Sequence, residues 1–130
     1  KTIDNKIYNS IKKVIGDEVD YSNKEVVSRA LMWGSIDIFL SDKKFSKKEQ
    51  EIFKKNFGDK STESIISLIK ISKPKSIQEK INYTFDEASK LLNKDKEKII
   101  NELTKLLKVV DGDKKTAESV INKIKTNLKI

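Results

Sequence analysis

The sequence of 130 residues contains no cysteine and no histidine. Without cysteine it forms no disulfide and no thiolate metal site, and this absence leaves the cellular compartment open. Without histidine it lacks the most common general base and metal ligand. No apolar run approaches the roughly 18–20 residues of a membrane span. These absences exclude a disulfide-based fold, histidine-dependent catalysis and a transmembrane segment in this chain.

Arginine is also scarce. The 28 basic residues include a single arginine, Arg29, and the formal net charge is +8. Proteins that read nucleic-acid sequence favour arginine, whose planar fork pairs bidentately with guanine and phosphate. The lysines are interleaved with 20 acidic residues, as on solvated helix faces. We expect no specific nucleic-acid binding, and a general attraction to polyanions or anionic membrane surfaces remains the alternative function.

Apolar residues recur with helical periodicity through the whole chain. A capping box of Ser22 and Glu25 predicts the start of a helix near Asn23, and the helix is expected to end near Ser41. Gly34 lies inside this helix at a cost of about 1 kcal/mol relative to alanine, so we expect another helix to approach closely there. Val26–Leu40 is apolar on more than one face, which predicts the central helix of a bundle.

The same periodicity predicts an all-α fold, a compact bundle of about seven helices in one domain spanning 1–130. Six other helices are expected. The first lies at 4–15, the second runs from a Ser46–Glu49 capping box to Phe57, and the third follows a cap at Ser61 or Thr62. The fourth runs from a Ser76–Glu79 box to Leu92, the fifth continues to Val110, and the last runs from Thr116 to Leu128. The expected core consists of apolar residues from five of these segments: Ile7, Ile11, Ala30, Leu31, Ile36, Phe39, Leu40, Phe53, Leu103, Leu107, Ile121 and Ile124.

Two acidic turns have the same spacing. Asp42 and Glu49 are seven residues apart, and so are Asp111 and Glu118. Each pair follows an apolar helix and precedes an amphipathic one, so the chain is expected to contain a pseudo-repeat of helix, Asp turn and helix. A structural role is favoured: the aspartate caps the next helix, and the glutamate lies near the positive end of its dipole.

A helix–Asp-Gly-x5-Glu–helix unit that occurs twice in an all-helical domain resembles the tellurite-resistance B-like (TerB-like) domain, also found at the N-terminus of the DjlA co-chaperone. Asp111, Gly112 and Glu118 match this motif, whereas the first copy has Lys43 in place of the glycine. Family members often carry further acidic residues in the turn; lysines fill those places here, which argues against an acidic or metal-linked function. The resemblance implies an accessory domain associated with chaperone-like, stress-response or protease modules.

Searches for catalytic and metal-binding motifs are negative. The sequence has no phosphate loop, dinucleotide fingerprint or nucleophile elbow. A calcium loop counted from Asp111 would place Lys115 and Asn122 at ligand positions, and one counted from Asp42 would place Phe53 there. We therefore expect no catalytic residue, no metal and no cofactor. A stress-linked enzyme or metal-binding unit is a third hypothesis, and only the twin acidic turns favour it.

The predicted function is that of a non-catalytic helical interaction domain. Because the chain begins with Lys1 rather than methionine, we expect it to be a piece of a longer bacterial protein. The expected partner is another protein or another domain of the same polypeptide. Aromatic anchors often dominate such interfaces, and the candidates are Trp33 and Phe45, one or the other of which is expected to be partly accessible at the end of the central helix beside the Asp42 turn. The alternative is that these aromatics belong to the core.

Overall fold

The computed structural model describes residues 23–130, and this part of the chain is helical without strands. Its six α-helices are α2 (Lys24–Phe39), α3 (Lys47–Phe57), α4 (Asp59–Ile71), α5 (Pro74–Ala88), α6 (Asn93–Lys105) and α7 (Lys114–Leu128). Short 3₁₀ turns, η3 (Leu40–Asp42) and η4 (Leu106–Lys108), extend α2 and α6. The all-α class is confirmed. The helix expected at 4–15, with Ile7 and Ile11, lies outside the described residues, as does Ser22.

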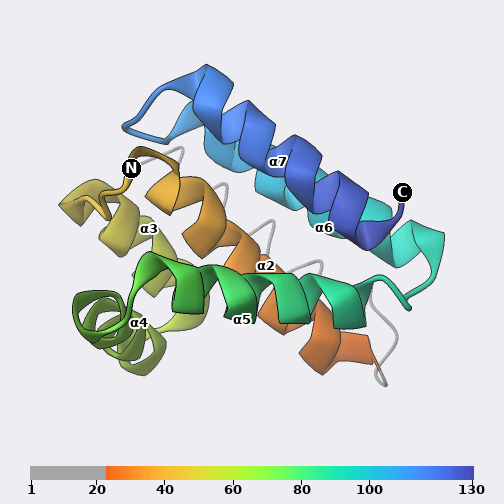
Figure 1. Cartoon of the computed structure of the whole chain (residues 1–130), viewed down its shortest axis with the longest axis horizontal. Helices are drawn as coiled ribbons and strands as arrows, with labels where there is room; N and C mark the ends of the chain where they lie inside the picture. The colour runs from red at the N-terminus through yellow and green to blue at the C-terminus, as the bar shows by residue number, and fades with distance from the viewer. Residues whose placement is uncertain (1–22) are drawn as a thin grey trace.

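Helix α2 is the central element, as its apolar pattern predicts. It packs against α3, α5, α6 and α7 and crosses the middle of the molecule in Figure 1. Nine of its residues are buried, including Ile36, Ile38 and Phe39. Because these residues point to different sides of the helix, α2 buries more than one face and holds the other helices around it.

Two neighbouring helices approach α2 closely at Gly34. A Cβ built on this glycine would lie 2.6 Å from Cδ1 of Leu103 on α6 and 3.1 Å from Cζ of Phe85 on α5. Both of these neighbours are fully buried. The close approach expected from the sequence is therefore confirmed, and it offsets the low helix propensity of glycine.

The predicted core is largely buried. Among its described members, only Leu40 and Leu107 retain partial exposure, and both lie in 3₁₀ turns at the end of a helix. The largest fully buried side chains, each below 2% exposure, include residues outside the expected core set: Ile38, Ile52, Ile81, Phe85, Ile99 and Leu106.

Several predicted helix boundaries are wrong. Helix α4 begins at Asp59, directly after Gly58, rather than at a Ser61 or Thr62 cap. Gly58 has φ +90° and separates α3 from α4 by one residue, a conformation that glycine adopts without a Cβ penalty. Helix α5 begins at Pro74, which places Ser76 in its first turn instead of at its cap. Proline suits this first position because its missing N–H has no helical partner there.

Helices α5, α6 and α7 also differ from prediction at their ends. Helix α5 ends at Ala88, and α6 begins at Asn93 after Leu92, which is extended at the N-cap position. Helix α7 is capped by Asp113 rather than Thr116. The Asp113 carboxylate accepts from both the backbone N–H and the hydroxyl of Thr116, at 3.3 and 3.0 Å, so Thr116 donates to the cap instead of forming it.

Candidate functional site

The two acidic turns, far apart in the sequence, lie against each other. A Cβ added to Gly112 would come within 2.7 Å of Cβ of Asp42 and 3.0 Å of its Cγ. Real Cβ atoms do not tolerate such a distance, so a side chain at position 112 would push the turns apart. The missing side chain at Gly112 therefore allows the two turns to pack in direct contact.

Helix α3 begins with the predicted capping box. The Ser46 hydroxyl accepts from the Glu49 backbone N–H at 3.1 Å, and Glu49 Oε1 accepts from the Ser46 backbone N–H at 3.0 Å. These reciprocal bonds satisfy two donors that have no partner within the helix. They also hold the Glu49 side chain at the N-terminus of α3, turned towards the second turn.

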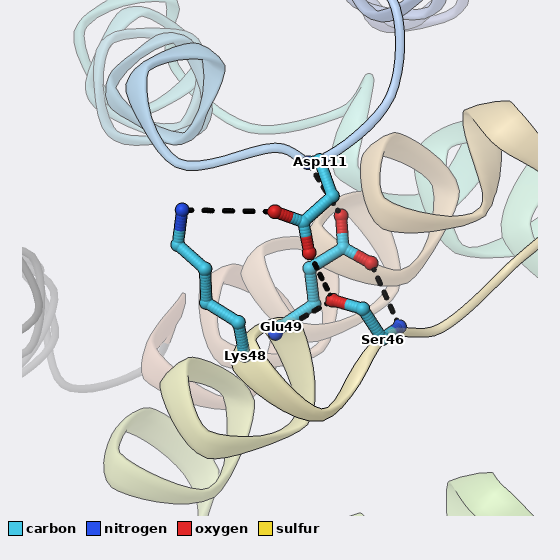
Figure 2. Close-up of polar contacts among 4 residues, drawn as sticks. All are labelled: Ser46, Lys48, Glu49 and Asp111. Atoms are coloured by element: carbon cyan, nitrogen blue, oxygen red, sulfur yellow. Dashed lines mark hydrogen bonds and ion pairs between the residues drawn. The ribbon is translucent and has the colours of Figure 1, made fainter.

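Ser46, Lys48, Glu49 and Asp111 form a polar cluster across the two turns, which we call the turn junction (Figure 2). Glu49 Oε2 accepts from the Asp111 backbone N–H at 3.2 Å, between residues 62 positions apart. The Ser46 hydroxyl donates to Asp111 Oδ2. Lys48 Nζ lies 3.6 Å from Asp111 Oδ1. The capping box of α3 thus also binds the loop before α7.

Glu49 is the buried centre of the junction, with 1% of its surface exposed. Burial raises the pKa of its carboxyl above the ordinary value, and the negative charges of Asp42 and Asp111 act in the same direction. The backbone N–H groups of Ser46 and Asp111 lower the pKa and oppose part of this rise. The site therefore combines a desolvated carboxylate with two bonds that keep it oriented.

The predicted capping roles of the two aspartates are wrong. Asp42 Oδ1 accepts from the Lys44 backbone N–H at 3.0 Å within its own turn, and Ser46 caps α3. Asp111 accepts from Ser46 across the junction, while Asp113 caps α7. The reason is the distance to the following helix: the cap lies four residues after Asp42 but only two after Asp111.

Glu118 has no part in the junction. Its expected counterpart Glu49 is the third residue of α3, whereas Glu118 is the fifth residue of α7 and is exposed. Equal spacing from the aspartates thus places the glutamates at different helical positions. The pseudo-repeat is not confirmed.

Phe45 belongs to an aromatic cluster. Its ring stacks on Phe39 with centroids 6.1 Å apart and meets the edge of Phe53 at 5.9 Å; Phe53 in turn lies 4.8 Å from Phe57. Phe39 and Phe53 are fully buried, and Phe45 is partly buried against them. Phe45 therefore anchors the first turn to the core.

Trp33 lies elsewhere, about two and a half helical turns before Asp42. It is partly buried and borders two shallow hollows. One, of about 690 Å³ between α2 and α5, is also lined by Arg29 and Tyr83; the other, of about 420 Å³ between α2 and α4, is also lined by Met32 and Lys60. Trp33 occupies the middle of α2, away from the Asp42 turn, so of the two candidate aromatics only Phe45 lies beside that turn.

Two polar features were missed in the sequence. Asp37, inside the apolar run of α2, is buried and forms an ion pair with Lys123 of α7 at 2.9 Å. Burial raises the Asp37 pKa, and Lys123 opposes this. Asp95, in the first turn of α6, is fully buried. The sequence did contain an indication that Asp37 is buried, since it is a charged residue within an apolar helical stripe.

Comparisons of the chain with protein-family models, curated proteins and solved structures found no match. The TerB-like resemblance stays a prediction. In the part of the chain from residue 23 onwards, no helix is both long and apolar enough to cross a membrane. Over the same residues, no group of three or more acidic side chains is arranged to hold a metal ion.

Proposed function

We propose that this chain is a non-catalytic helical interaction domain. It would bind a protein partner, or another domain of the same polypeptide, through the Trp33 surface, defined as Arg29, Trp33 and Tyr83. The observation that carries this proposal is that the only tryptophan of the chain stays partly exposed between two hollows, one of which it shares with the exposed Tyr83.

The chemistry of the Trp33 surface suits protein recognition. Tryptophan, tyrosine and arginine are the residues most enriched among those that dominate binding energy at interfaces. Tyr83 is 66% exposed, which is unusual for a large aromatic side chain. The hollows on both sides of Trp33 would receive side chains of the partner, and the indole would fill the space between them.

Two ion pairs hold the Arg29 side chain on this surface. Arg29 is four residues from Trp33 on the central helix, and its guanidinium pairs with Glu25 at 2.5 Å and with Glu87 of α5 at 3.8 Å. These pairs limit the conformations of the arginine before a partner arrives, which reduces the entropy lost on binding. The accessory role implied by the TerB-like resemblance favours the same proposal.

A photo-reactive amino acid tests this surface in cells. Placed at position 83, it should cross-link to one discrete protein or to another segment of the same polypeptide. Placed at Asn101, an exposed position on α6, it should not. Trp33→Ala should abolish the cross-link from position 83 while the purified variant retains its helical circular dichroism. Equal cross-linking from positions 83 and 101 would refute the assignment.

The polyanion alternative is supported by the net charge of +8. It predicts binding to duplex DNA or anionic vesicles that weakens steeply with salt. Tyr83→Ala leaves the net charge unchanged and should not affect such binding. Tight polyanion binding at physiological salt, together with no cross-link from position 83, would replace the interaction proposal with this alternative.

A further inference from the structure

A third, more enclosed pocket lies where the end of α2 meets the end of α4 and the start of α5. Its volume is about 450 Å³, within the roughly 300–1,000 Å³ typical of small-molecule sites. Leu40, Ile69, Ile77 and Ile81 provide apolar walls, and Asp37 and Lys43 are its charged residues. Trp33 does not line it, so the pocket is separate from the Trp33 surface.

The two charges in the pocket differ in their partners. The Asp37 carboxylate already has a cation, Lys123, at 2.9 Å, and only 8% of the Asp37 side chain is exposed. Lys43 is exposed and forms no ion pair with any residue in 23–130. The charge available to a ligand is therefore the positive one.

Lys43 also occupies an unfavourable backbone conformation. Its φ of +66° lies in the left-handed region, where a Cβ crowds the following carbonyl. A glycine would form the same turn without this cost. The lysine thus brings an ammonium group to the pocket at a position where the backbone alone would favour glycine.

We propose that this pocket binds a small amphipathic carboxylate, with its apolar chain between Leu40, Ile69 and Ile81 and its carboxylate at Lys43. The apolar walls disfavour a purely polar anion, since Ser72, Gln78 and Lys43 would compensate only part of its desolvation. The Asp37–Lys123 pair disfavours a cationic ligand, which would have to compete with an existing short ion pair.

Three eight-carbon probes separate the possibilities: octanoate, octanol and octylamine, each titrated as monomers below micelle formation. Amide chemical shifts in two-dimensional NMR identify the site, and calorimetry gives the affinity. Octanoate should shift residues of η3, the end of α4 and the start of α5, and should bind at least tenfold more tightly than octanol or octylamine. Tighter binding of octylamine, or equal binding of octanol, would overturn the assignment of the headgroup.

Lys43→Gly removes the ammonium group and suits the left-handed backbone, so this variant should fold. It should weaken octanoate binding at least tenfold and leave octanol unchanged. Lys44→Ala removes a neighbouring positive charge that does not line the pocket and should leave octanoate affinity within twofold. Equal losses in the two variants would show general charge attraction, and shifts away from the pocket would overturn the site itself.

Discussion

The two acidic turns share one spacing, yet their glutamates end in opposite environments. In the first turn Phe45 packs among phenylalanine rings and Glu49 is buried at the cap of α3. In the second turn the position equivalent to Phe45 is occupied by Lys114, and Glu118 faces solvent on α7. The first turn is therefore anchored in the core, and the second turn docks on it through Asp111 and Gly112. The spacing of charged residues alone does not show which of two similar turns carries buried interactions.

The largest difference between the turns should come from their glutamates. Glu49→Ala leaves the backbone N–H groups of Ser46 and Asp111 without their acceptor. Since an unsatisfied, partly buried donor costs about 1–3 kcal/mol, we expect a loss of about 2–3 kcal/mol in the free energy of unfolding. Urea denaturation measures it.

Glu118→Ala is the matched control for this prediction. Its side chain is exposed, and surface substitutions of this kind change stability by about 0.5 kcal/mol or less. Similar losses in the two variants would mean that the turns are equivalent after all, and that the capping box adds little to the stability of the bundle.

The contact between the turns should be the next most sensitive feature. Gly112→Ala places a Cβ against Cβ of Asp42, and we expect it to cost about 1–2 kcal/mol through overpacking. In the Asp42→Gly background the same change should cost much less, because the clashing atom is absent. If Gly112→Ala costs as much in that background as it does alone, the turns are not in contact as described.

Lys43→Gly, in the first turn, should increase the free energy of unfolding instead of lowering it. It relieves a left-handed conformation worth about 1–2 kcal/mol but increases the entropy of the unfolded chain by up to about 1 kcal/mol. The expected result is a gain of about 0.5 kcal/mol, measured by the same denaturation. A loss of stability would indicate that the Lys43 side chain contributes packing of its own.

The smallest effect concerns pH. Because the pKa of Glu49 is raised in the folded protein, the folded state holds this proton more tightly than the unfolded state. The resulting stabilisation is present below the unfolded pKa of about 4.3 and is lost as pH rises through the folded pKa. Asp37, with a raised pKa, acts in the same direction.

Glu49→Gln should therefore make stability fall less steeply as pH increases above about 4.3, the ordinary glutamate value. Chemical denaturation at a series of pH values gives both slopes. Glu118→Gln serves as the control, and its slope should match that of the unchanged protein. An unchanged slope in Glu49→Gln would show that Glu49 titrates as a solvated carboxyl.

Features that depend on neighbours in the sequence were predictable. The Ser46–Glu49 capping box follows from two residues three positions apart, and the burial of Ile36 and Phe39 follows from helical spacing. Ser76 was misread as a cap because Pro74, two residues before it, already suits the first position of the helix. Asp113 was missed as a cap because Thr116, three residues later, competes for the same role in the sequence.

The sequence by itself determined the helical class, the central position of α2, the need for a small residue at Gly34 and the cap of α3, since each rests on local spacing or on the volume of one residue. Only the tertiary structure decided that Glu49 binds the backbone of Asp111, that Lys123 neutralises Asp37, and that Lys43 borders an apolar pocket. These contacts join segments distant along the chain, and the packing of helices around α2 sets which of many similar charged residues meet. Once buried, the few charged residues that meet affect the free energy of unfolding more strongly than the exposed ones, and burial raises the pKa of Asp37 and Glu49.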